Sequence, residues 1–390
     1  MKNTPTDPVP VLQELIRCRS VTPAEGGALT YLENLLSQHG FVCHRLVFRE
    51  EGTPDVENLF ARIGSGAPHL CFAGHTDVVP EGIAEAWTHP PFAAEISNGY
   101  VYGRGACDMK GSVAAFAAAA IDFIRGTRKF KGSISFLITG DEEGPAINGT
   151  AKVLQWMREN GHVPDHCIVG EPSSAEKLGD TIKIGRRGSL SFTVTVEGKQ
   201  GHAAYPHKAD NPIPKLARFV DRIAAAKLDD GNEHFDPSTL AVTTFDVGNP
   251  AGNVIPSRAT AKFNIRFSTE HGFASLKGWV EDEVAKITAE MGGAWTVSAT
   301  EGADAFITEP GRFVGLVQDA VERETGILPK LSTSGGTSDA RFVKDYCPVL
   351  EFGPVNATIH QTDERMAIEE LRATQAIYGR IIADYFSAEL

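Results

Sequence analysis

Residues 133–143 read SISFLITGDEE, a run of β-favouring apolar residues that ends at a glycine and is followed at once by three carboxylates. Such a run predicts a strand buried on both faces, which is typical of a parallel sheet. The run HLCFAG precedes His75 and Asp77, and the run HCIVG precedes Glu171. Because ligands bind beyond the carboxyl ends of parallel strands, these side chains are expected to meet at one edge of the sheet.

The segments around these runs alternate between helix-like and strand-like patterns. Helix-period segments lie at roughly 8–18, 27–39, 112–126, 150–160, 311–325 and 367–386. Strand-like runs lie near 41–48, 57–63, 69–75, 133–139, 166–170 and 348–352. This alternation predicts an α/β fold with a mostly parallel sheet flanked by helices.

The pattern changes near residue 187. SLSFTVTVEG and ATAKFNIRFST alternate apolar and polar residues at period two, which indicates strands with one face exposed to water. With two helix-like stretches, the order becomes strand, helix, two strands, helix, strand, which predicts a ferredoxin-like α+β domain. We therefore expect a catalytic domain of residues 1–186 and 300–390, interrupted by an inserted domain of residues 187–299.

Composition limits the kinds of partner. The 390-residue chain is 42% hydrophobic and carries a formal net charge of −13, which argues against nucleic acid and anionic membranes. The N-terminal stretch has no apolar run typical of a signal peptide, and the apolar stretch 112–124 is too short to span a bilayer. The six cysteines are scattered without a CxxC pair, so we expect a reducing cytoplasm.

The convergent side chains have the ligand types of a two-metal hydrolase. Glu142 and Glu143 follow a buried strand directly, so one carboxylate could bind metal while the other acts as general base. His75 and Asp77 point the same way along an extended segment, and Asp77 could hold the second ring nitrogen of His75. A solvated acidic turn and a hydrogen-bonded structural histidine are the alternatives.

Two further candidates have weaker local signals. Asp108 lies in GRGACDMKG, where the glycines allow close backbone approach, and a carboxylate there could touch two metal ions. A phosphate-binding loop is disfavoured because the third glycine of GxGxxG is missing, and Cys107 lacks a nucleophile signature. His360 closes the stretch EFGPVNATIH, and we expect it just after a strand; taken alone, such a histidine is more often structural than a ligand.

Taken in order, the motifs HTDVVP, GRGACDMKG, DEEGPAINGT, VGEPS, GRRGS, QGHAAYPH, GNVIP, GGTSDARF and GPVNATIH resemble those of the M20 metallopeptidase family. The resemblance spans about residues 10 to 385. It is strongest to the bacterial branch that hydrolyses N-succinyl-L,L-2,6-diaminopimelate, a small anionic substrate, to succinate and L,L-diaminopimelate. It implies a zinc-exopeptidase-like catalytic domain.

The resemblance also implies a cofactor and its ligands. Two Zn²⁺ per subunit, replaceable by Co²⁺, would be bridged by Asp108. His75 and Glu171 would complete one site, and Glu143 and His360 the other. Glu142 would be the base, and the peptide bond after Asp108 would be cis.

The resemblance also implies that the inserted domain, residues 187–299, is a lid and dimerisation domain. A homodimer would form through it, with His202 of one subunit stabilising the oxyanion in its partner. Arginine binds carboxylate with two parallel hydrogen bonds, which points to two arginines as anchors for the substrate's carboxylates. The residues expected to contact substrate are Arg186, Tyr205, Asn253, Arg266, Gly336, Thr337 and Asn356.

Other functions remain open from the sequence. The first alternative is an acetylornithine deacetylase or another N-acyl-amino-acid hydrolase with the same metal site. A metal-free binding relative is disfavoured because Asp108, Glu142 and Glu143 are all present.

Overall fold

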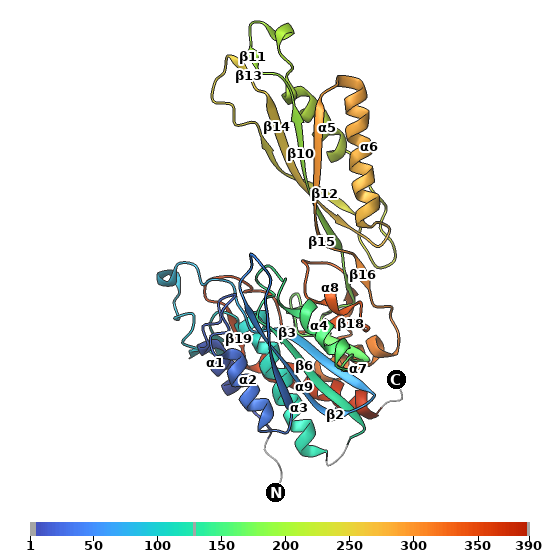
Figure 1. Cartoon of the computed structure of the whole chain (residues 1–390). Helices are drawn as coiled ribbons and strands as arrows, with labels where there is room; N and C mark the ends of the chain where they lie inside the picture. Colours follow the sequence, from blue (N-terminus) through green and yellow to red (C-terminus); the bar gives the residue numbers. More distant parts are fainter. Residues whose placement is uncertain (1–4, 128–129, 388–390) are drawn as a thin grey trace. The chain divides into compact units, whose positions relative to one another are not determined.

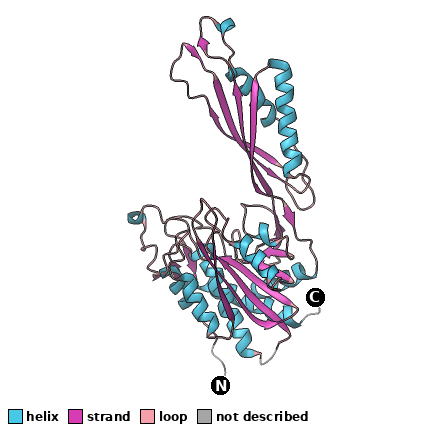
Figure 2. Cartoon of the chain, viewed as in Figure 1, coloured by secondary structure: helices cyan, strands magenta, loops and turns pink. Residues whose placement is uncertain are grey.

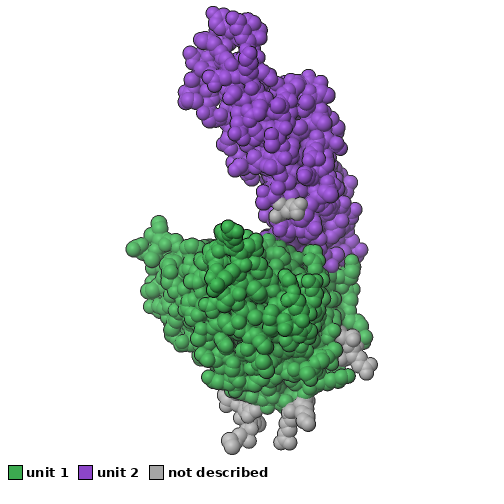
Figure 3. Space-filling view, viewed as in Figure 1, with its two compact units in different colours: residues 1–184, 308–332, 338–390 green, residues 185–307, 333–337 purple. Residues whose placement is uncertain are grey.

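The computed structural model describes residues 5–127 and 130–387. It divides into two compact units (Figure 3). The first comprises residues 1–184, 308–332 and 338–390, and the second residues 185–307 and 333–337. The domain boundaries expected from the sequence stay a prediction.

An eight-stranded sheet forms the centre of the first unit (Figures 1 and 2). Strands β6, β3, β7 and β18 run parallel to one another, whereas β1 and β2 form an antiparallel edge. In spatial order the strands are β1 (Val42–Phe48), β2 (Val56–Ser65), β6 (Gly132–Thr139), β3 (His69–His75), β7 (His166–Val169), β18 (Val349–Glu351), β8 (Thr181–Lys183) and β17 (Lys330–Ser332). Every residue of β3 and β6 is buried, as their unbroken apolar runs predict.

Helices flank this sheet. They are α1 (Pro8–Arg17), α2 (Ala28–Ser37), α3 (Gly111–Gly126), α4 (Thr150–Glu159), α7 (Arg312–Thr325), α8 (Ala340–Val343) and α9 (Ile368–Ser387). Alanine-rich α3 is buried over its first eleven residues and packs along α9. Phe116 of α3 stacks on Phe72 of β3 with ring centroids 4.4 Å apart, and Tyr378 of α9 meets Phe72 edge-on. These rings hold β3, whose last residue is His75, against the helices.

Short elements complete the first unit. They are η1 (Ala84–Ala86), β4 (Ile96–Ser97), β5 (Tyr100–Tyr102), the one-turn segment η2 (Ala106–Lys110) and β19 (Arg365–Ala367). Strands β19, β5 and β4 form a small antiparallel sheet.

The second unit is a four-stranded antiparallel sheet covered on one face by two helices (Figure 1). Its elements are β10 (Gly188–Glu197), α5 (Pro212–Ala224), β12 (Thr239–Asp246), β14 (Arg258–Phe267), α6 (Phe273–Met291) and β15 (Ala294–Ala303). The spatial order β12-β14-β10-β15 is that of a ferredoxin-like domain. Smaller pairs are β9 (Gly185–Arg186) with β16 (Phe306–Ile307) and β11 (Gly201–His202) with β13 (Val254–Ile255), and η3 (Pro206–Lys208) follows β11.

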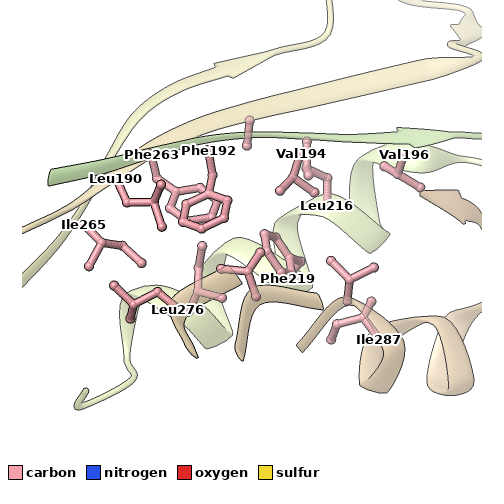
Figure 4. Packing of buried hydrophobic residues seen from close by; sticks show 14 of the residues in the cluster. Leu190, Phe192, Val194, Val196, Leu216, Phe219, Phe263, Ile265, Leu276 and Ile287 are labelled. Carbon is pink, nitrogen blue, oxygen red and sulfur yellow. The ribbon is translucent and has the colours of Figure 1, made fainter. Parts of the chain in front are cut away.

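The core of the second unit follows from the period-two pattern of its strands. Phe192 and Phe263 stack with centroids 5.0 Å apart, and Phe219 of α5 packs beside them (Figure 4). Burying a side chain of this size contributes about 1.5–3 kcal/mol. The predicted fold class, a mostly parallel α/β sheet with an inserted α+β domain, is confirmed.

Among residues 5–127 and 130–387, no helix is both long and apolar enough to cross a membrane.

Candidate metal centre

Three parallel strands deliver ligand-type side chains to one edge of the sheet. His75 is the last residue of β3 and pairs with Thr139, the last residue of β6. The backbone N–H of Thr76 donates to the carbonyl of Thr139, so the two chains stay together past the strand ends. Asp141–Glu143 then follow β6, and Glu171 follows β7. The predicted convergence at the carboxyl edge is therefore present.

Asp108 lies between the two histidines. Its Oδ1 is 3.2 Å from His75 Nε2, and its Oδ2 is 3.1 Å from His360 Nε2. The segment η2 carries it to this place, and Gly105 before it has φ 84°, a left-handed conformation that suits glycine. The Asp108–Met109 peptide bond is cis, as the family resemblance implied. Each oxygen of this one carboxylate thus faces a different imidazole.

His360 reaches the cluster in a way that the sequence reasoning had wrong. We expected it directly after a strand, but β18 ends at Glu351 and His360 lies nine residues later in a turn, with φ 57°. Its Nε2 is 2.8 Å from Glu143 Oε1, and its side chain is 45% exposed. Glu143 and His360 therefore meet on the more open side of the cluster.

Asp77 is also placed differently from the expectation. His75 Nδ1 lies 2.9 Å from the backbone carbonyl of Asp77, whereas the nearer carboxylate oxygen of Asp77 is 3.7 Å away. The buried carboxylate instead accepts the backbone N–H groups of Glu142 at 3.3 Å and Glu143 at 3.0 Å. The main chain of Asp77 orients the imidazole, and its side chain fixes the bend that carries the two glutamates.

Burial and like charges act strongly on the carboxyl groups. Burial, with the charges of Asp339 and Glu143, raises the pKa of Glu142 to about 8. Burial, with the charges of Asp108 and Glu142, raises the pKa of Glu171 well above its ordinary value. A buried anion that lacks enough positive partners takes up a proton in this way.

The pKa values of the two histidines are also raised, but here the raised pKa stabilises the charged form. Burial lowers the pKa of His75, but its hydrogen bond to Asp108 and the surrounding carboxylates outweigh this and raise it well above the ordinary value. Hydrogen bonds to Asp108 and Glu143 raise the pKa of His360 to about 10. The site attracts positive charge, and divalent cations among these carboxylates would supply it.

The donor atoms fit metal ions. Two ligands of one tetrahedral Zn²⁺, bound at about 2.0–2.1 Å, stand about 3.3 Å apart. The pairs joining His75 to Asp108 and Glu171 measure 3.2 and 3.8 Å, and those joining His360 to Asp108 and Glu143 measure 3.1 and 2.8 Å. Among residues 5–127 and 130–387, three sets of possible ligand atoms lie within 4.8 Å of one another: His75, Asp108 and Glu171; Asp108, Glu143 and His360; and His75, Glu142 and Glu143. The first two share Asp108.

Sequence reasoning missed two buried carboxylates close to this cluster. Glu364 accepts hydrogen bonds from the backbone that carries Asp108. Asp339 accepts from Thr150 Oγ1 at 2.6 Å, and its charge contributes to the raised pKa of Glu142. Asp339 stands in the motif GGTSDARF, which we had used for the resemblance alone, and Glu364 has no local signal beyond a polar turn.

Of the residues expected to contact substrate, Asn356 belongs to the first unit and the others to the second. Within the second unit, Arg186 is buried and donates to the carbonyl of Ser334 at 3.1 Å, in the loop that also holds Gly336 and Thr337. Burial and the charge of Arg187 lower the pKa of Arg266. The approach of these side chains to substrate stays a prediction.

A second group forms at the β11–β13 ribbon. His202 pairs with Val254, and the N–H of Ala203 donates to the carbonyl of Asn253 at 2.9 Å. The rings of His202 and Tyr205 are 5.8 Å apart, and Tyr205 is 54% exposed. The expected residues His202, Tyr205 and Asn253 are thus brought together.

The family profile described as Peptidase family M20/M25/M40 matches residues 71–384. The chain belongs to this family. A protein of Parvibaculum lavamentivorans named succinyl-diaminopimelate desuccinylase is 55% identical over 384 residues, which cover 98% of this chain and 97% of that protein. A protein of Rhodospirillum centenum with the same name is 54% identical and covers 98% of both chains. The resemblance seen in the sequence is confirmed.

Solved structures of the M20 fold agree with the architecture. The aminopeptidase PepT of Bacillus cereus superposes with a TM-score of 0.77 at 22% identity, covering 97% of this chain and 98% of the other. A dinuclear metal-binding M20 peptidase of Bacillus subtilis gives a TM-score of 0.73 at 16% identity, with the same coverage. At these identities the comparison shows the fold.

Proposed function

We propose that this M20 hydrolase cleaves N-succinyl-L,L-2,6-diaminopimelate to succinate and L,L-diaminopimelate, a step of diaminopimelate and lysine biosynthesis. The observation that carries the proposal is identity of 54–55% over essentially the whole chain to proteins named for this activity. The cluster at the sheet edge supports it, because amide hydrolysis is chemistry that paired metal ions and a free carboxylate perform.

We assign His75, Asp108 and Glu171 to one Zn²⁺ and Asp108, Glu143 and His360 to a second, with Co²⁺ as a possible substitute. This assignment is preferred over the set with Glu142 because the two oxygens of Asp108 face the two histidines at 3.2 and 3.1 Å. When bound, the two ions lower the pKa of a water molecule and polarise the amide carbonyl.

Glu142 is then left as the proton carrier. Asp77 accepts the backbone N–H groups of Glu142 and Glu143 and so fixes the bend of the main chain that carries the two carboxylates. Glu142 accepts a proton from the attacking water and delivers it to the leaving amine nitrogen. Burial of its carboxylate favours proton uptake.

The second unit supplies the remaining groups of the proposal. The carboxylates of the substrate oppose the net charge of −13, so they need local cations, and we assign Arg186 and Arg266 to them. The polar contacts assigned to substrate are Tyr205, Asn253, Gly336, Thr337 and Asn356. His202 of a partner subunit stabilises the oxyanion, which makes a homodimer through this unit part of the mechanism.

The direct test is hydrolysis of succinyl-diaminopimelate by the zinc-loaded full-length protein, with acetylornithine under the same conditions as the comparison. We expect release of succinate with a kcat/KM at least about a hundredfold above that for acetylornithine, since a site that reads an extra carboxylate rejects an acyl group lacking it. Faster hydrolysis of acetylornithine would contradict the substrate assignment.

All six cysteines are free, which supports the expected reducing cytoplasm.

A further inference from the structure

Glu364 is a fully buried carboxylate with four hydrogen-bond donors around it. Its Oε1 accepts the backbone N–H groups of Cys107 at 3.0 Å and Asp108 at 3.1 Å. Its Oε2 accepts the N–H of Gly105 at 3.0 Å and Arg104 Nη1 at 2.8 Å. The carboxylate therefore holds the backbone of the loop that carries Asp108.

Two further hydrogen bonds join this loop to the segment after His360. The backbone N–H of Gly103 donates to the carbonyl of Glu364 at 2.8 Å, and Arg104 Nη1 also donates to the carbonyl of Gln361 at 3.2 Å. Asp108 and His360 thus stand on two segments that are fastened to each other at Glu364. His75 and Glu171 are positioned separately, by the ends of β3 and β7.

We infer that Glu364 is a positioning residue for the metal site formed by Asp108, Glu143 and His360, and that it sets the distance between Asp108 and His360. The inference rests on the metal centre of the proposed function. It goes beyond that assignment, because Glu364 does not contact the side chain of Asp108 or His360. It acts on the backbone of the loop that carries Asp108.

A carboxylate is suited to this place because it only accepts hydrogen bonds. An amide in its position would keep one oxygen and turn an NH₂ group toward two donors, so two of the four hydrogen bonds would be lost. A buried donor left without an acceptor is costly, and the loop would move to relieve it. Asp108 and His360 would then both move, so the site with Glu143 would lose the placement of two of its three ligands. The site with His75 and Glu171 would lose the placement of Asp108 alone.

The test compares wild type, Glu364→Gln and the control Asp180→Asn as zinc-loaded full-length proteins dialysed against graded chelator, with bound zinc counted. Asp180 also accepts three backbone N–H groups, from residues 175–177, but none of these residues is a metal ligand. Altering groups that orient metal ligands typically weakens metal binding by roughly 10–100-fold.

We expect one of the two zinc ions of Glu364→Gln to leave at a chelator concentration at least about tenfold lower than in wild type. The other ion shares only Asp108 with the disturbed loop, so it should shift by a smaller factor, and Asp180→Asn should match wild type. The kcat of Glu364→Gln should fall while KM stays unchanged, and added Zn²⁺ should restore part of kcat. If Glu364→Gln does not fold, Glu364→Asp takes its place with the same expectation, because the shorter side chain cannot reach both donor pairs.

Equal loss of both ions, or retention of both as in wild type, would overturn the positioning role alone. A wild-type protein that holds fewer than two zinc ions would instead contradict the metal centre itself.

Discussion

The histidine at the start of β3 should make the protein sensitive to mild acid. His69 is buried; its Nε2 lies 2.7 Å from Ser135 Oγ and its Nδ1 lies 3.3 Å from the carbonyl of Val163. A neutral imidazole satisfies both contacts, with Nδ1–H as donor and Nε2 as acceptor. Burial, followed by the charge of Arg62, lowers the pKa of His69 to about 4.

The pKa of His69 is lower in the folded protein than in the unfolded chain, where histidine has a pKa of about 6.5. The unfolded state therefore binds the proton first as the pH falls. The contribution to stability is complete above pH 6.5 and is lost between about pH 6.5 and 4. The full effect is on the order of 3 kcal/mol, and linkage gives about 2 kcal/mol lost between pH 7.5 and 5.

Urea unfolding at pH 7.5 and pH 5 measures this loss in wild type, in His69→Gln and in the control His39→Gln. His39 lies in the same unit and bonds the carbonyl of Leu35 on the helix surface. The decrease in unfolding free energy between the two pH values should be about 2 kcal/mol smaller in His69→Gln than in wild type and His39→Gln. The same decrease in all three proteins would refute the reasoning.

Three further predictions concern catalysis. Glu142→Gln should lower kcat at least about a hundredfold, as expected for loss of a general base, while zinc stays at two per chain by elemental analysis; normal turnover would remove Glu142 from that role. Mixed dimers of one His202→Ala subunit and one Glu142→Gln subunit should keep one working site, since only one site then lacks both groups; inactivity equal to that of either parent would show that His202 is not shared. Arg266→Ala should reduce kcat/KM for succinyl substrates far more than for acetyl substrates, and equal losses would speak against its reading of the succinyl carboxylate.

The ligands at strand ends were predictable from the sequence. His75 ends, and Glu171 follows, a short run of β-favouring apolar residues that indicates a buried strand, and the carboxyl ends of neighbouring parallel strands lie at one edge. The four-stranded sheet of the second unit was predictable as well, because period-two alternation shows which face is covered. In both cases the apolar residues that form the sequence pattern are the same residues that bury the strand in the fold.

Other parts of the site depend on contacts between distant segments, which no local pattern encodes. His360 comes nine residues after β18 in a left-handed turn, so no strand end points to it. Glu364 and the side chain of Asp77 act on backbone N–H groups 256 and 65 residues away. Nearly every residue type has a backbone N–H group, so a carboxylate that accepts from one needs no particular residue at that position. Carboxylates that act in this way therefore leave no motif in the sequence.

Crystals of the zinc-loaded protein, measured at the zinc absorption edge, would test the central claim most directly. The account predicts two anomalous peaks, one on each side of the Asp108 carboxylate, the first also bound by His75 and Glu171 and the second by Glu143 and His360. A single peak, or two ions that do not share Asp108, would contradict it.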